Sequence, residues 1–261
     1  MYEIIMAEKI LIKQIIDELD ALLGRNDYVA AEAHLMNWIC EAQTRGDMSA
    51  KLSLTNEMMG LCRKVGKREA AYEAAENALT LCTELGLAGS VTEGTTCVNA
   101  ATVYKSFGDA VRALPLYRRA RQIYETELEK YDSRLGGLYN NMALALVDDG
   151  EYTAADELYH RALDVMSHNR YGQLEMAITY LNMANAKEAE TGLVEAEQYI
   201  NDCIDRARSL LDTPDIPRNG YYAFVCEKCA PTFGYYGYFL DEIEYGRRAK
   251  NIYSGGGNEG N

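Results

Sequence analysis

Proline, tryptophan and histidine are scarce in this sequence of 261 residues, which contains four, one and three of them. Two of the prolines, Pro214 and Pro217, lie close together, so most of the chain is free of the residue that interrupts helices. No stretch reaches the ~18 to 20 consecutive apolar residues that a membrane-spanning helix needs. These scarcities favour a largely helical protein and predict no transmembrane segment.

A cleavable leader and a disulfide framework are also missing. The first residues, Met1 to Lys9, mix acidic with apolar side chains and lack the basic start of a signal peptide. The seven cysteines are an odd number, and their spacing is not that of a small disulfide-rich domain, which indicates buried free thiols in a reducing compartment. We therefore expect a soluble cytoplasmic protein.

Basic residues are fewer than acidic ones: the sequence has 26 Lys and Arg, 40 Asp and Glu, and a formal net charge of −14. The averaged field of such a chain repels nucleic-acid phosphates and anionic membrane surfaces. Neither nucleic acid nor a membrane is an expected partner, although a local cationic patch can reverse the average. Neutral, amphipathic or basic segments of other proteins are the electrostatically easier ligands.

Internal repetition is what the sequence has in abundance. One copy consists of Gly150, Tyr152, Ala155, Tyr159 and Ala162, and its third position recurs at residues 31, 71, 113, 155, 196 and 242. The six copies therefore follow one another at intervals of 40, 42, 42, 41 and 46 residues. The five other copies are Asn26, Tyr28, Ala31, Leu35, Trp38; Gly66, Arg68, Ala71, Ala75, Ala78; Gly108, Ala110, Ala113, Tyr117, Ala120; Thr191, Leu193, Ala196, Ile200, Cys203; and Gly237, Phe239, Glu242, Gly246, Ala249.

Each copy predicts a pair of helices. The glycine or small polar residue suits the end of a first helix, where a left-handed conformation is common, and the Ala-x-x-x-Tyr-x-x-Ala spacing places small and large residues on one face of a second helix. A single pair cannot bury its own apolar face, so consecutive pairs must stack. The predicted array covers residues 1–253, with repeats at 12–46, 52–88, 94–131, 136–169, 177–212 and 221–253, and a flexible tail at 254–261.

Residues 138–143 (LYNNMA) and 150–163 (GEYTAADELYHRAL) carry a family resemblance. They resemble the tetratricopeptide repeat family, in a long form similar to the repeats of kinesin light chains and many bacterial tetratricopeptide proteins. The usual repeat has 34 residues, and about 8 more add roughly one turn to each helix. The resemblance spans about residues 10 to 253. It implies an all-α right-handed superhelix of about six antiparallel helix pairs, and a non-catalytic scaffold that binds a protein or peptide in a concave groove.

Asparagines recur at one position of the first helices, at Asn99, Asn141 and Asn182. They lie two residues beyond the first core position, which at about 100° per residue turns them away from the core. A carboxamide has two donors and an acceptor, so a row of them can bind the backbone of an extended peptide, as groove asparagines do in related repeats. The candidate peptide-binding residues are Asn99, Thr102, Lys105, Asn140, Asn141, Asn182 and Asn185. Alternatively, the asparagines bridge neighbouring helices and are structural.

A metal or catalytic site has little support in the sequence. Cys226 and Cys229 form a Cys-x-x-Cys motif, which is half of a typical zinc site or a redox pair, but both fall on core positions of the sixth first helix and read more simply as buried thiols. The three histidines lack a second ligand at metal-binding spacing, and no nucleotide-binding glycine loop or nucleophile elbow is present. We therefore predict no cofactor and no enzymatic activity.

Aromatic residues crowd the last repeat, where ten of the chain's 25 lie between residues 221 and 253. The end of a solenoid normally needs a polar capping helix, so part of this aromatic surface is a candidate interface for a homo-oligomer. The other interpretation is a locally aromatic core.

A second functional hypothesis is a regulator whose repeat array changes conformation when it binds a signalling peptide. Such regulators usually carry an added output domain, and the predicted repeats begin near residue 10, which leaves little room for one. The scaffold is therefore the preferred interpretation.

Overall fold

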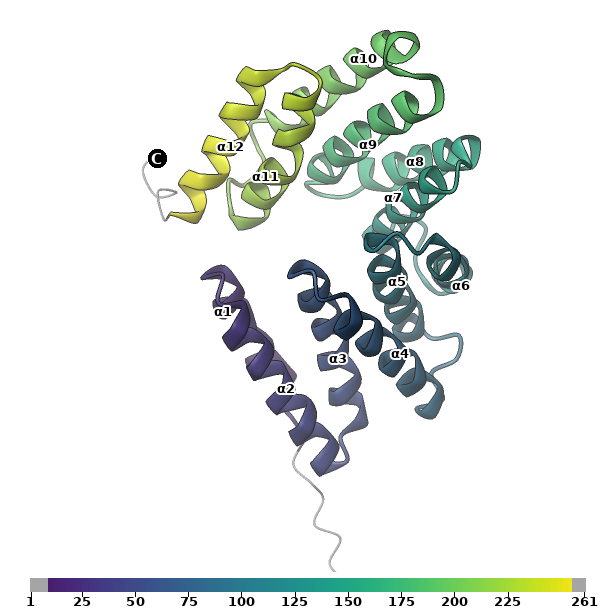
Figure 1. The fold of residues 1–261 in the computed structure, drawn as a ribbon, viewed down its shortest axis with the longest axis vertical. Helices are drawn as coiled ribbons and strands as arrows, with labels where there is room; N and C mark the ends of the chain where they lie inside the picture. The colour runs from purple at the N-terminus through teal and green to yellow at the C-terminus, as the bar shows by residue number, and fades with distance from the viewer. Residues whose placement is uncertain (1–8, 255–261) are drawn as a thin grey trace, which may run out of the picture. The chain divides into compact units, whose positions relative to one another are not determined.

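The structure is a computed structural model that describes residues 9–254. Within that range, every regular element is an α-helix, which confirms the predicted all-α fold class. The helices follow one another as pairs joined by short turns (Figure 1). They divide into two compact units, Met1–Glu127 and Leu128–Asn261. Of the tail predicted at 254–261, residues 255–261 lie outside the described residues.

Unit 1 contains the first three helix pairs. Each first helix packs on its own second helix, and α3 also packs on α2 and on α5. The pairs are α1 (Ile12–Gly24) with α2 (Tyr28–Arg45), α3 (Met48–Lys64) with α4 (Arg68–Glu84), and α5 (Val91–Ser106) with α6 (Ala110–Glu127).

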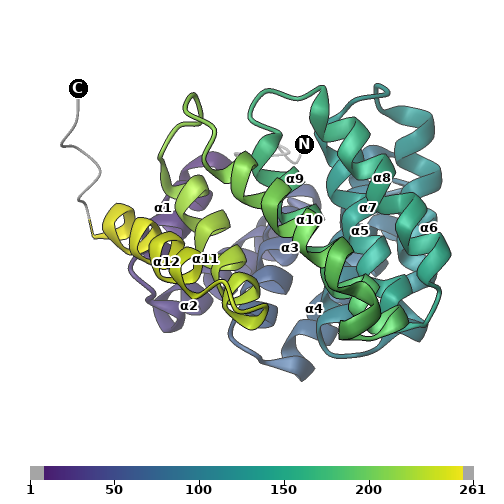
Figure 2. The same cartoon turned by 90° about the horizontal axis from the view of Figure 1, so that it is seen from above.

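Unit 2 contains the other three pairs, and its first helices form a layer in which α9 packs against both α7 and α11. Figure 2 shows α10 beside α9 and α12 beside α11, in agreement with these contacts. We call the surface of α7, α9 and α11 the first-helix face of unit 2. The pairs are α7 (Ser133–Asp148) with α8 (Tyr152–Ser167), α9 (Gln173–Thr191) with α10 (Leu193–Leu211), and α11 (Gly220–Tyr235) with α12 (Phe239–Tyr253).

The repeated small residues of the second helices form the contact with the first helices. The third position of the repeat is an alanine in the first five copies, and each of these alanines is fully buried. A methyl group at this position lets two helix backbones approach closely, while the larger residue one turn later fills the space beside it. Tyr117 and Tyr159, at that later position, are both 1% exposed.

The sixth copy departs from the predicted pattern. Glu242 is only half-buried and Gly246 is exposed, whereas Tyr245 is 1% exposed and Ala249 is 3% exposed. Tyr245 packs against Phe233 with 5.1 Å between ring centroids, so an aromatic contact replaces the alanine contact between the helices of the last pair. Tyr235 and Phe239 are 68% and 62% exposed, so the last repeat has both an aromatic core and exposed aromatic side chains.

The turns inside the pairs explain the glycine positions. Gly108 and Gly150 have φ angles of 78° and 80°, a left-handed conformation that costs glycine little and most other residues more. In the first copy Asn26 takes the same conformation, with φ of 57°. In the fifth copy the left-handed residue is Gly192 rather than the predicted Thr191.

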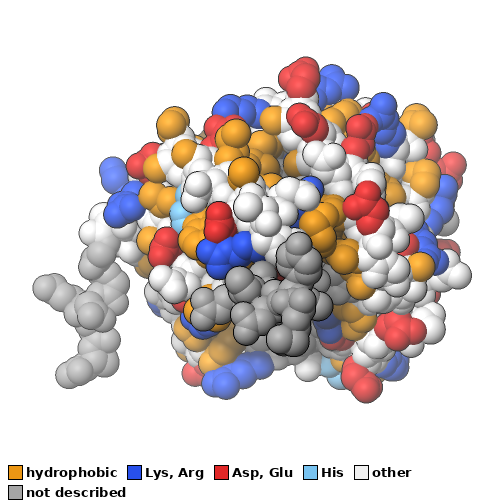
Figure 3. All heavy atoms as spheres, turned by 90° about the horizontal axis from the view of Figure 1, so that it is seen from below, with side chains coloured by type: hydrophobic (Ala, Val, Ile, Leu, Met, Phe, Trp, Pro, Cys, Tyr) orange, Lys and Arg blue, Asp and Glu red, His pale blue; other side chains and the backbone are white. Residues whose placement is uncertain are grey.

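The surface is mixed in character. On the face shown in Figure 3, acidic, basic and hydrophobic side chains are interspersed, so the acidic side chains do not form one continuous patch there. In residues 9–254 no helix is both long enough and apolar enough to cross a bilayer.

Candidate functional site

Carboxamide side chains join consecutive first helices in each unit. In unit 1, the Nδ2 group of Asn99 on α5 donates to Oδ1 of Asn56 on α3 at 2.9 Å. In unit 2, Nδ2 of Asn182 on α9 donates to Oδ1 of Asn140 on α7 at 3.1 Å. A carboxamide has further donor and acceptor capacity after one such bond. The bridging interpretation therefore applies to these four residues, and ligand binding by the same row stays a prediction.

The other predicted site residues of unit 1, Thr102 and Lys105, are both half-buried. The hydroxyl of Thr102 donates to the carbonyl of Val98 at 2.8 Å and forms a hydrogen bond with the hydroxyl of Tyr117 at 3.0 Å. Thr102 thus ties α5 to the second helix of its own pair. Lys105, one turn further along α5, is half-buried.

Two of the predicted residues in unit 2 line a cavity on the first-helix face. Asn140, which is 5% exposed, and Asn141, which is half-buried, contribute to its wall. The cavity has a volume of about 640 Å³, within the range of ~300 to 1,000 Å³ typical of ligand pockets. Its other lining residues come from α7, from the end of α8 and the turn that follows it, and from α9 and α11: Ser133, Arg134, Gly137, Met166, Asn169, Arg170, Tyr171, Gly172, Glu175, Tyr221 and Lys228.

The residues that line the cavity include more basic than acidic side chains, in contrast to the chain as a whole. Its lining includes the cations Arg134, Arg170 and Lys228 but only one carboxylate, Glu175. Arg134 pairs with Asp132 at 2.6 Å and lowers the pKa of that carboxyl group. The averaged negative field therefore does not describe this surface, and a peptide with an acidic group is compatible with it.

Glu175 is the electrostatically unusual member of this lining. Burial raises the pKa of its carboxyl group, and the positive charge of Lys228 opposes that rise in part. The hydroxyl of Tyr221 on α11 donates to the same carboxylate. Glu175 therefore links α9 to α11 at the edge of the cavity.

Asn182 and Asn185, the predicted residues on α9, have different surroundings. Asn182 is half-buried against α7, whereas Asn185 is exposed and accepts a hydrogen bond from the hydroxyl of Tyr236 at 2.9 Å. Tyr236 also donates to Glu188 at 2.8 Å. The structure thus places Asn182 beside Asn140, and holds Asn185 at the junction with the last repeat.

Sequence reasoning missed two residues that lie at or next to the asparagine position of their repeats. Asn56 lies 43 residues before Asn99, and this interval of about one repeat was the signal for it. Lys228 lies two residues after the core position of its helix, Cys226, just as Asn141 lies two residues after the core position Tyr139. In the sixth copy, the position that holds asparagine in three earlier repeats therefore holds a cation.

Six of the seven cysteines are buried. Cys226 and Cys229 are both buried, as predicted, and burial raises the pKa of both thiols, that of Cys229 to about 12. Cys40 is exposed, which corrects the expectation that the thiols are generally buried. Among residues 9–254 no three His, Cys, Asp or Glu side chains are grouped as metal ligands.

Comparisons with known proteins give matches only at the level of structure. No family model and no curated protein matches the sequence. BtubC from P. vanneervenii is similar in structure, with a TM-score of 0.67 and 22% identity over 80% of this chain and 84% of that chain. The chain has a tetratricopeptide-like helical repeat fold.

Two further solved structures with this fold are similar at lower sequence identity. A kinesin light chain-like protein from Podospora anserina, with nearly identical TPR-like repeats, has a TM-score of 0.53 and 14% identity over 80% of this chain and 98% of its own. NprR, solved in complex with its cognate peptide NprX, has a TM-score of 0.59 and 16% identity over 92% of this chain and 66% of its own. At these identities the likeness establishes the fold alone.

Proposed function

We propose that the protein is a non-catalytic module that binds an extended peptide segment on its first helices, and that in unit 2 the segment lies along α7, α9 and α11. The observation that carries this proposal is the cavity of about 640 Å³ on the first-helix face, which has Asn140 and Asn141 in its wall. In unit 1 the proposed contacts are on the equivalent helix α5, at Asn99, Thr102 and Lys105.

Asn141 is the residue best placed to contact a ligand. It is half-buried and lines the cavity, and within the described part of the chain its carboxamide is not used in a hydrogen bond, whereas Asn140 and Asn182 bond to each other. An extended peptide presents alternating N–H and C=O groups, which a carboxamide can bind at the same time as donor and acceptor. Asn140 and Asn182 position this region by holding α7 and α9 together.

The charges of the cavity indicate what the peptide carries. Arg134 is paired with Asp132, but Arg170 and Lys228 still outnumber the single lining carboxylate of Glu175, so an acidic side chain at one position of the peptide is favoured there. The fold similarity to NprR, a protein solved with a bound peptide, supports peptide binding without identifying the sequence that is bound. A regulator that changes conformation on binding uses the same face, and small-angle scattering with and without peptide distinguishes it from a static scaffold.

Selection from a displayed library of 12-residue peptides against the full chain provides a test. A selected peptide is measured by calorimetry against wild type, Asn141→Ala, and a control, Asn77→Ala, which is exposed on α4 of unit 1. Loss of one or two hydrogen bonds to the ligand is worth about 1 kcal/mol or slightly more, so Asn141→Ala should weaken binding five- to tenfold. The control should change the Kd by less than twofold. If Asn141→Ala binds as tightly as wild type, the proposed site is wrong.

A second proposal concerns self-association through the last helix. On α12, Phe239, Leu240 and Ile243 are 62%, 84% and 65% exposed, and three such neighbours are unusual on the surface of a monomer. A second copy of the chain that covers them would remove this apolar surface from water. Light scattering at micromolar concentration should give twice the monomer mass, and Ile243→Lys should return the mass to that of one chain. A monomeric wild type excludes the proposal.

A further inference from the structure

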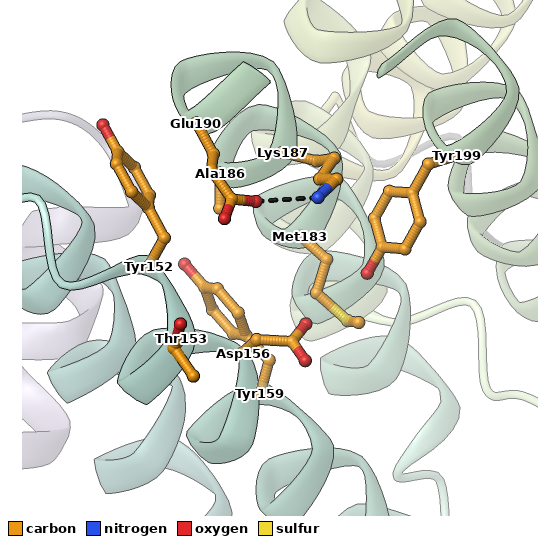
Figure 4. A pocket seen from close by; sticks show the side chains of 9 residues that line it. All are labelled: Tyr152, Thr153, Asp156, Tyr159, Met183, Ala186, Lys187, Glu190 and Tyr199. Atoms are coloured by element: carbon orange, nitrogen blue, oxygen red, sulfur yellow. Dashed lines mark hydrogen bonds and ion pairs between the residues drawn. The ribbon is translucent and has the colours of Figure 1, made fainter. Parts of the chain in front are cut away.

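A second cavity lies away from the first-helix face, between α8, the C-terminal half of α9, and α10 (Figure 4). Its volume is about 320 Å³, at the lower end of the range for ligand pockets of ~300 to 1,000 Å³. In Figure 4, Tyr152 and Tyr199 stand on opposite sides of it, and Asp156 lies across the view from the Lys187–Glu190 pair. A space of this size accommodates one large side chain rather than a helix or strand.

The hydroxyl of Tyr159 has no hydrogen-bond partner among the residues that the structure describes. The side chain is 1% exposed, and its hydroxyl end points into the cavity. Buried tyrosine hydroxyls nearly always find a partner, because leaving a polar group unpaired costs stability. This hydroxyl is therefore available to an incoming polar group.

The preceding repeat shows how this tyrosine is normally accommodated. Tyr117 occupies the same repeat position 42 residues earlier, and its hydroxyl bonds to Thr102 at 3.0 Å. The position that corresponds to Thr102 in the fourth repeat is Leu144, which has no polar side-chain atom. The fourth repeat thus has the tyrosine but a leucine in place of its hydrogen-bonding partner.

The charges around the cavity favour a cation. Lys187 and Glu190 form an ion pair at 2.8 Å, so each offsets the charge of the other. Asp156 is the additional carboxylate, and its Oδ2 lies 3.4 Å from Nδ1 of the His160 ring. Burial raises the pKa of the Tyr159 and Tyr199 hydroxyls, and the charges of Asp148 and Asp156 respectively add to those rises. The local potential is thus negative.

We propose that this cavity binds the side chain of an arginine from a partner protein or peptide. The guanidinium group carries five N–H donors in one plane, which the carboxylate of Asp156 and the oxygen of Tyr159 can accept. Its flat faces stack against aromatic rings, and Tyr152 and Tyr199 stand on either side of the space. The site is separate from the proposed peptide-binding cavity, so either one can fail without the other.

The test uses N-acetyl-L-arginine methylamide as the probe and the methyl resonance of Met183 as the reporter. Met183 lines the cavity and is 4% exposed, and the resonance lost in Met183→Leu assigns it. Addition of the probe to the full chain, labelled with ¹³C in its methionine methyl groups, should shift this resonance saturably, with a Kd in the millimolar range. The norleucine analogue, which lacks the charge, should leave the resonance unchanged.

Three variants make the result specific. Tyr159→Phe should weaken the binding about tenfold, as expected for a lost hydrogen bond to a charged group, whereas Tyr117→Phe should leave it within twofold. Lys187→Met removes the competing ammonium group, so it should tighten binding of the arginine probe. Equal shifts with the norleucine probe, an unchanged Kd in Tyr159→Phe, or weaker binding in Lys187→Met would each overturn the proposal.

Discussion

Tyr117 and Tyr159 offer a paired test of the structure itself. The two tyrosines occupy the same position of consecutive repeats and are equally buried, at 1% exposure. The hydroxyl of Tyr117 bonds to Thr102 at 3.0 Å, whereas that of Tyr159 has no partner among residues 9–254. Phenylalanine removes the hydroxyl from each site and keeps the ring, so the two substitutions differ mainly in the hydrogen bond.

The expected effects have opposite signs. Tyr117→Phe removes a net hydrogen-bond contribution of about 0.5 to 1.5 kcal/mol and should lower the free energy of unfolding by that amount. Tyr159→Phe removes a buried unpaired group, whose burial costs about 1 to 3 kcal/mol before any relaxation. It should leave stability unchanged or raise it by about 1 kcal/mol, so the two variants should differ by about 1 to 2 kcal/mol.

Urea unfolding followed by far-UV circular dichroism gives the free energy of unfolding of both variants. The slope of the free energy against urea concentration should be unchanged in each, because the surface exposed on unfolding is the same. If Tyr159→Phe loses as much stability as Tyr117→Phe, the Tyr159 hydroxyl is paired in the folded protein. In that case the difference described between the third and fourth repeats is wrong.

Four other substitutions test the remaining parts of the structure. Ala155→Leu should destabilise unit 2 by about 1 to 3 kcal/mol, because Ala155 is fully buried at a helix contact; thermal unfolding checks this, and a change of only a few tenths would contradict the packing. Asn140→Ala should cost about 1 to 2 kcal/mol and Asn141→Ala less than about 0.5 kcal/mol, since only Asn140 is both buried and bonded to a neighbouring helix; equal losses in urea would refute this distinction. Glu175→Gln should stabilise the protein at pH 7, because the pKa of Glu175 is raised in the folded state and its ionised form opposes folding there. That advantage should shrink as the pH falls to about 4, where the wild-type carboxyl group is protonated in both states; an advantage that grows on acidification would show that the pKa is lowered instead.

The repeat could be predicted from the sequence because its physical cause is local. Ala113, Ala155 and Ala196 recur at nearly constant spacing, and each is fully buried at a helix contact. Periodic small residues indicate helix packing directly, because each helix pair makes the same close contact at the same position of its repeat. The sixth copy was less predictable, because Tyr245 replaces the contact that Glu242 and Gly246 were expected to make.

The candidate site was harder to predict, because its residues come together from different repeats. Asn141 and Asn182 could be predicted from their offset from the core positions of their helices. The hydrogen bond between Asn182 and Asn140 could not, because it depends on how α7 and α9 are placed. Arg170 and Tyr171 lie in a turn outside the repeat pattern, so periodicity carries no signal for them. The overall negative charge likewise concealed the cations that gather in the cavity.

The proposed function is tested most directly by mapping where a selected peptide contacts the folded chain. Backbone amide resonances of the full chain would be followed by NMR as the peptide is added. Our proposal places the largest shifts on the first helices, above all on α7 and α9 around Asn141 and Asn182. Shifts confined to the second helices α8, α10 and α12, with the amides of α7 and α9 unchanged, would contradict it.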